Sequence, residues 1–193
     1  MDAIFLIVLS FFTSAFTAII GMGGGIVLIS LMPGLLPVQA VVPVHGVVQL
    51  ASNTSRAALG LRHIEWSIFW SFVGGAVLGA VQTFLSLFVG VGGPLVASFL
   101  WRQGLSRDCV VSTQASVMTG LHGFKVLTFG LLGFVFRPYL LLIVAMMVSV
   151  SLGSYVGTRL RKYVPEAYFR PIYRTVVTVL ALRLIIVFLV DGD

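Results

Sequence analysis

Two glycine-rich stretches interrupt long apolar runs of this sequence, and they constrain the fold more than any other feature. The first is Gly21-Met22-Gly23-Gly24-Gly25, and the second, 69 positions later, is Gly90-Val91-Gly92-Gly93-Pro94. Glycine destabilises a helix interior by roughly 1 kcal/mol relative to alanine, so a cluster of three or more should break a helix. In a membrane, irregular backbone is tolerated only where protein buries it or where it lines an aqueous cavity. We therefore expect a binding site at these two stretches.

The composition places the chain in a bilayer. Of its 193 residues, 59% are hydrophobic and 9% are charged, and the mean hydropathy is +1.09, whereas about a quarter of the residues of a soluble domain are charged. The chain is long enough for roughly six or seven spans of about 20 residues each. We expect an all-α, multi-pass bundle that forms a single membrane domain over residues 1–193 in the inner or plasma membrane.

Several function classes are disfavoured by the residues present. The net charge of +6 comes from Lys and Arg residues that fall mostly at the ends of apolar runs, as orientation signals do, so nucleic acid is not an expected partner. Cys109 is the single cysteine, which excludes a CxxC metal or redox pair. The sequence contains no P-loop, HExxH or GxSxG motif. We expect no enzyme activity, no cofactor and no metal.

The segment after the first glycine cluster is too short to cross a membrane. Residues 26–36 number eleven, and at 1.5 Å per residue they cannot span the hydrocarbon core. Residues 3–36 therefore form either one interrupted span or a re-entrant hairpin, which ends at a turn containing Pro33-Gly34 and Pro37.

A polar stripe follows on the next expected helix, residues 38–61. The polar side chains follow one another at steps of four, three, one and three, which places them on one helix face: His45, Gln49, Ser52, Asn53 and Arg56. A shift of 69 residues, the spacing of the glycine clusters, puts His45 on Gln114, Asn53 on His122 and Arg56 on Lys125. The sequence thus predicts two repeats, at about residues 3–85 and 86–190.

The charge distribution predicts how the repeats are oriented. The connection around residues 159–174 carries five bases against one acid, which marks it as cytoplasmic. With residues 3–36 as a re-entrant hairpin, the two repeats then have opposite orientations. Inverted repeats that meet at paired broken helices are a recurrent plan of secondary transporters, with the substrate near the midplane.

These motifs together resemble the sulfite exporter TauE/SafE family. The resemblance is carried by the two glycine clusters with their apolar strips and turns, by the His63 turn before Trp66, and by Gly74-Gly75 and Leu78-Gly79, repeated as Leu152-Gly153. It implies about eight membrane segments in two halves and the movement of sulfite, sulfoacetate or related organic anions. Between Gly79 and Gly90 there is room only to finish one helix, so we interpret the chain as a shortened member.

The candidate substrate site combines backbone and side-chain donors. Broken helices expose N–H groups and positive helix ends to an anion, here at Gly23, Gly24, Gly25, Gly92 and Gly93. Hydrogen bonds to an oxyanion are expected from His45, Gln49, Asn53, Gln114 and His122. The alternatives are close helix packing for the glycines and interhelical hydrogen bonding for the polar side chains.

Two basic residues and the histidines have separate predicted roles. Arg56 and Lys125 would attract an anion into the cavity, or alternatively anchor helix ends at the interface. The histidines permit a proton as the coupling ion, because their unperturbed pKa is near 6.5.

The sequence leaves two functions open. The first is a secondary membrane transporter that moves a small anion such as sulfite or an organosulfonate. The alternative is a non-transporting assembly subunit, or a truncated and inactive transporter copy. A homo-oligomer is compatible with both.

Overall fold

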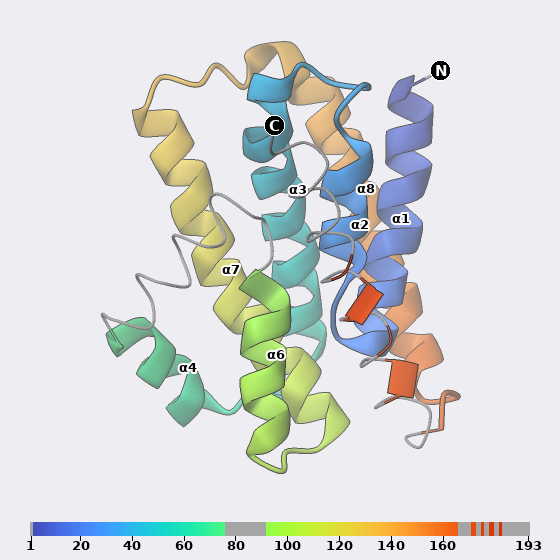
Figure 1. The fold of residues 1–193 in the computed structure, drawn as a ribbon, viewed down its shortest axis with the longest axis vertical. Helices are drawn as coiled ribbons and strands as arrows, with labels where there is room; N and C mark the ends of the chain where they lie inside the picture. The colour runs from blue at the N-terminus through green and yellow to red at the C-terminus, as the bar shows by residue number, and fades with distance from the viewer. Residues whose placement is uncertain are drawn as a thin grey trace.

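The computed structural model describes residues 2–75 and 92–165, together with residues 171, 172, 175, 178, 179 and 182. The described residues form helices and no β-strand (Figure 1). The helices are α1 (Asp2–Ile20), α2 (Gly24–Leu31), α3 (Val38–Leu59), α4 (Trp66–Gly74), α6 (Gly92–Arg102), α7 (Arg107–Leu131) and α8 (Leu140–Arg161), with 3-10 turns at Leu61–His63 and Arg137–Tyr139. The all-helical class is as the sequence predicts. The interval between Gly79 and Gly90, with the predicted shortening, lies outside the described residues.

The first glycine cluster breaks the helix as its composition predicts. Helix α1 ends at Ile20, and α2 begins four residues later at Gly24. In between, Gly21 and Gly23 have φ angles of 94° and 98°. This left-handed conformation is costly for every residue with a Cβ, so glycine is required at both positions.

Helices α1 and α2 form a hairpin rather than one interrupted span. In Figure 1, α1 descends from the N-terminus, and α2 turns back toward the same end before the chain enters α3. With eight residues, α2 is about 12 Å long and covers less than half of a hydrocarbon core of ~30 Å. The re-entrant alternative is the one that the structure shows.

The two helices that carry the polar stripes pack against each other at the centre. Helix α3 descends in Figure 1 and α7 ascends beside it. They begin at Val38 and Arg107, which are separated by the same 69 positions as the glycine clusters. Helix α8 covers α3 and α1, while α4 and α6 cover α7. Each half of the chain therefore supplies a helix that packs on the central helix of the other half.

Small residues let α1 and α8 approach closely. A Cβ added at Gly153 or Gly157 would overlap the backbone of α1, at the carbonyl oxygens of Phe11 and Ala15 respectively. Serine hydroxyls join the same helices to α3: Ser14 Oγ lies 2.8 Å from the hydroxyls of both Ser52 and Ser154. Interhelical hydrogen bonds of this kind stabilise membrane bundles by about 0.6 kcal/mol on average. Ser14 of the first helix thus serves packing.

Two apolar clusters flank the middle of the bundle. One joins α1, α2, α3 and α8 around Leu28, Val44 and Met146. The other joins α4, α6 and α7 around Val96, Leu100 and Val117. The polar faces of α3 and α7 lie in the part of the bundle that these clusters leave unfilled.

The outer surface is apolar while many polar side chains are buried. Exposed side chains include Phe12, Leu131, Leu141 and Val148, whereas hydroxyl, amide and basic side chains line the helix contacts. This distribution is the one expected of a protein whose surroundings are lipid. Within the described residues, Asp2–Ile20 and Arg137–Arg161 are long and apolar enough to cross a membrane. The count of six or seven spans stays a prediction.

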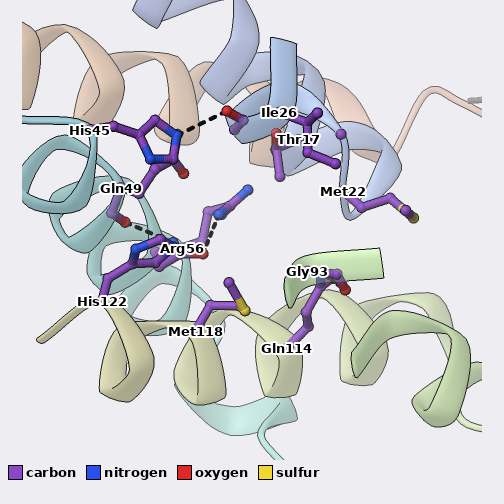
Figure 2. A pocket seen from close by; sticks show the side chains of 13 residues that line it. Thr17, Met22, Ile26, His45, Gln49, Arg56, Gly93, Gln114, Met118 and His122 are labelled. Carbon is purple, nitrogen blue, oxygen red and sulfur yellow. Dashed lines mark hydrogen bonds between the residues drawn. The ribbon is translucent and has the colours of Figure 1, made fainter. Parts of the chain in front are cut away.

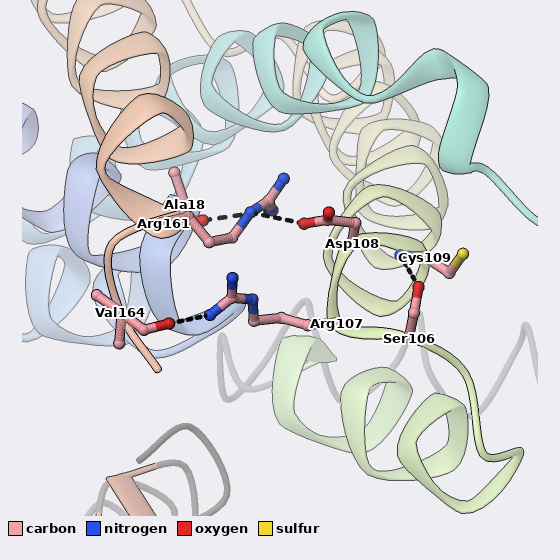
Figure 3. Close-up of polar contacts among 7 residues, drawn as sticks. All are labelled: Ala18, Ser106, Arg107, Asp108, Cys109, Arg161 and Val164. Carbon is pink, nitrogen blue, oxygen red and sulfur yellow. Dashed lines mark hydrogen bonds and ion pairs between the residues drawn. The ribbon is translucent and has the colours of Figure 1, made fainter. Parts of the chain in front are cut away.

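A polar cluster ties three helix ends together at the lower end of the bundle (Figure 3). Arg161 at the end of α8 forms an ion pair with Asp108 of α7, with Nε and Oδ1 3.0 Å apart. Its Nη1 also lies 3.5 Å from the carbonyl oxygen of Ala18 in α1. Beside it, Arg107 donates a 2.6 Å hydrogen bond to the carbonyl oxygen of Val164.

Candidate functional site

A small pocket lies where the two stripe helices meet the starts of the two short helices (Figure 2). Its volume of about 40 Å³ exceeds the space that one water needs. The pocket is lined by Thr17, Met22, Gly23, Gly25, Ile26, His45, Gln49, Asn53, Arg56, Gly93, Gln114, Met118 and His122. None of these lining residues is acidic, so the pocket has a positive balance.

The two halves of the chain make the same hydrogen bond at the pocket wall. His45 Nε2 on α3 lies 2.9 Å from the carbonyl oxygen of Gly25 on α2. Gln114 Nε2 on α7 donates over 2.9 Å to the carbonyl oxygen of Gly93 on α6. Since Gln114 is the residue that the 69-residue shift places on His45, these two bonds hold each short helix to its stripe helix in a matching way.

Arg56 is held inside the pocket by its neighbours on α3. Asn53 donates from Nδ2 to the carbonyl oxygen of Gln49 over 2.7 Å, which leaves its Oδ1 to accept from Arg56 Nη2. Only 6% of Arg56 is exposed. The guanidinium therefore faces the pocket, whereas the interface-anchoring alternative requires it to reach the surface.

Five buried polar atoms at the pocket have no hydrogen-bond partner among the described residues. They are His45 Nδ1, Arg56 Nε, Arg56 Nη1, Gln114 Oε1 and His122 Nδ1. A buried polar group without a partner costs about 1–3 kcal/mol, and such groups in native proteins require an explanation. All four residues line one cavity, so a bound polar ligand or water would satisfy them together.

The short helices direct their N-termini toward this pocket from opposite ends of the bundle. In Figure 1, α2 ascends and α6 descends from the middle of the molecule. Gly25 and Gly93, in the first turn of each helix, line the pocket. The N-terminus of a helix carries about half of a positive charge, and its first amides have no partner within the helix. One of them, Gly24 N–H, is bonded to Thr17 Oγ1 at 3.0 Å.

Most of the predicted site residues come together here. The pocket collects Gly23, Gly25, Gly93, His45, Gln49, Asn53, Gln114, His122 and Arg56. Two predicted residues are not in its lining, Gly24 and Lys125. The surroundings of Gly92 lie outside what the structure describes. A Cβ at Gly24 would overlap the Thr13 carbonyl oxygen and the Thr17 hydroxyl, so this glycine serves helix packing.

Lys125 occupies a different place from its counterpart Arg56. Its side chain is 2% exposed and packs over Gly46, where an added Cβ would lie 3.2 Å from Lys125 Cδ. If Lys125 attracts an anion, as the sequence predicts, it does so by long-range electrostatic attraction and not by contact in the pocket.

Four lining residues were not predicted from the sequence: Thr17, Met22, Ile26 and Met118. A signal existed for two of them. Met118 lies midway between Gln114 and His122 at steps of four, on the same helix face, and Thr17 belongs to the polar face that leads into the first cluster. Only the fold shows that Met22 and Ile26 reach the cavity.

The comparisons with known proteins give one match. The family model described as Sulfite exporter TauE/SafE matches residues 82–184, which is more than half of the chain. Neither the curated proteins nor the solved structures give a match.

Proposed function

The chain belongs to the sulfite exporter TauE/SafE family, and on this premise we propose that it is a secondary transporter that binds a small oxyanion in the central pocket. The family is one of membrane proteins, and the protein is accordingly a membrane protein. Sulfite or a small organosulfonate is the proposed cargo, and the inner or plasma membrane is the proposed location.

One observation carries the proposal: Arg56 Nε and Nη1 are buried and unpartnered among the described residues, at a cavity whose described lining contains no acidic residue. Guanidinium N–H groups bind oxyanions with strong, charge-assisted hydrogen bonds. His45, His122 and Gln114 contribute further polar atoms, and the N-termini of α2 and α6 add positive ends of helix dipoles. The site thus resembles a solvation shell for a desolvated anion.

The two-repeat plan supports a transporter over a packing module. We propose that residues 3–85 and 86–190 are inverted repeats, because α2 and α3 run opposite to α6 and α7 and each pair shares a matching hydrogen bond. Inverted repeats provide two related conformations in which a midplane site faces either side in turn.

The proposed orientation follows the basic residues. Three segments lie at the lower end in Figure 1: the connection from α3 to α4, the connection from α6 to α7, and the residues at the end of α8. These segments carry Arg62, Arg102, Arg107, Arg159, Arg161 and Lys162, while Arg137 lies at the opposite end of the bundle. By the positive-inside rule, the lower end is cytoplasmic.

The test is sulfite movement in proteoliposomes that contain the purified full chain. We expect the parental protein to move sulfite and Arg56→Met to lower this flux at least tenfold. A proton gradient imposed in parallel samples tests whether a proton is the coupling ion. Arg159→Met is the matched control, because Arg159 is exposed and lies outside the pocket lining. Flux that is absent from the parental protein, or equal in Arg56→Met, contradicts the proposal and favours a non-transporting subunit or an inactive copy.

A further inference from the structure

The hydrogen-bonding roles of two pocket atoms are fixed by the backbone. A carbonyl oxygen only accepts hydrogen bonds, so the Nε2 atoms beside the carbonyls of Gly25 and Gly93 must both carry the hydrogen. For Gln114, this orients the amide and leaves Oε1 as a pure acceptor. For a neutral His45, it selects the tautomer in which Nδ1 is an acceptor.

Both of these acceptors are buried, unpartnered among the described residues, and located at the same cavity. His45 is in its neutral form in the pocket, because positive charge already surrounds it. Arg56 follows on its own helix, while His122 and Lys125 face it from α7. A third cationic group in one buried cluster would be opposed by repulsion and by loss of hydration.

The pocket therefore offers a ligand both hydrogen-bond donors and hydrogen-bond acceptors. Arg56 Nε and Nη1 are donors for an oxyanion, whereas Gln114 Oε1 and His45 Nδ1 would face the lone pairs of any ligand that has only acceptors. Such a contact leaves buried acceptors unsatisfied, which costs about 1–3 kcal/mol each. A ligand that brings its own hydrogen satisfies both sets.

We propose that the pocket selects a singly charged oxyanion that carries a hydrogen-bond donor, so that hydrogen sulfite is bound in preference to the sulfite dianion. This inference rests on the proposed function and specifies the chemical form of its cargo. One negative charge meets Arg56, and the ligand's own hydrogen meets Gln114 or His45. No covalent step is involved.

Sulfamate and methanesulfonate are suited to test this, because both are small monoanionic sulfonyl anions and only sulfamate carries N–H donors. Each is added as a competitor of labelled sulfite in proteoliposomes that contain the full chain. We expect sulfamate to compete about tenfold more strongly, the factor that one satisfied buried acceptor provides. The flux of sulfite itself should follow the concentration of hydrogen sulfite as the pH is raised.

Two variants connect the preference to the pocket. Gln114→Met keeps the side-chain length without an acceptor oxygen and should bring the ratio of the two competitors toward one. Gln103→Met is the matched control, since Gln103 is exposed in the turn between α6 and α7 and should retain the ratio. Should Gln114→Met fail to fold, the ratio in the parental protein decides.

The outcomes separate this inference from the proposed function. Equal competition by the two anions, or no competition by either while sulfite still moves, overturns the inference and leaves the transporter in place. A sulfamate preference that persists in Gln114→Met overturns the role of Gln114. Absence of sulfite movement in the parental protein overturns the proposed function.

Discussion

The imidazole rings of His45 and His122 lie 6.0 Å apart, centroid to centroid, and are inclined at 73° to each other. They come from α3 and α7, the two antiparallel helices at the centre of the bundle. Nδ1 of each ring is buried and unpartnered among the described residues. Because the two halves of the chain contribute one ring each, the pocket exists only when both halves are packed together.

The bond between His45 and Gly25 should tolerate glutamine. At the corresponding position of the second half, Gln114 makes the same bond to Gly93. We expect His45→Gln to keep the stability of the parental protein, whereas His45→Ala should lose about 1 kcal/mol, the net value of one hydrogen bond. Thermal unfolding of both purified variants in detergent measures the difference. Equal stability of the two variants would show that this bond contributes nothing to holding α2.

Removal of the Arg56 charge should stabilise the protein while it abolishes binding. The guanidinium is buried next to the neutral Asn53, and the part of the pocket lining that the structure describes contains no acidic residue. Burial of a charge without an opposite charge is costly, so we expect Arg56→Met to gain about 1 kcal/mol of unfolding free energy. The control Arg159→Met should change stability by less than about 0.5 kcal/mol, as exposed substitutions do. A loss of stability in Arg56→Met would indicate that Arg56 serves the fold.

Two glycines that look alike in the sequence should respond oppositely to alanine. A Cβ at Gly24 would overlap the Thr13 carbonyl oxygen, while a Cβ at Gly120 in the middle of α7 would meet nothing within 4 Å. We expect Gly24→Ala to cost about 1–3 kcal/mol through overpacking. Gly120→Ala should be neutral or stabilising by up to about 1 kcal/mol. Unfolding measurements on the pair check this, and equal effects would refute the assigned packing of α2 on α1.

The ion pair at the lower end of the bundle should couple α7 to α8. Asp108 is partly exposed, whereas Arg161 is buried; within the described residues, Arg161 also has a longer contact with the carbonyl oxygen of Ala18. We expect a coupling energy of about 1 kcal/mol or somewhat more, because one partner is shielded from water. The measurement is a double-mutant cycle with Asp108→Asn and Arg161→Gln. Additive effects of the two substitutions would mean that the pair holds neither helix.

The sequence predicted the stripes well because helix periodicity alone fixes which side chains share a face. His45, Gln49 and Asn53 follow one another at steps of four residues, and residues at that spacing share a face in any helix. It could not predict which glycines face the pocket, since this depends on the rotation of α2 against α1. Gly24 and Gly25 are neighbours in the sequence, yet Gly24 packs against Thr13 and Gly25 faces Gln49.

The close contact of α8 with α1 was likewise beyond prediction. Gly153 and Gly157 form a small-residue pair of the kind seen at helix contacts, but the sequence contains several such pairs. Only the fold identifies α1 as the partner of α8. In the contact between these helices, Arg161 meets Ala18, which is 143 residues earlier in the sequence. Long-range pairing of this sort depends on the arrangement of all the helices and is not encoded in any one segment.

The two short helices have an electrical consequence. Helices of eight and eleven residues are about 12 and 16 Å long, which together approach the ~30 Å of a hydrocarbon core. In the proposed inverted-repeat arrangement, each spans about half of the insulating layer, and the pocket between them lies near the middle of the transmembrane voltage. One charge that crosses the full layer gains or loses ~2.3 kcal/mol per 100 mV. An anion that reaches the pocket from either side would cross about half of that potential, so occupancy itself would depend on membrane voltage before any helix moves.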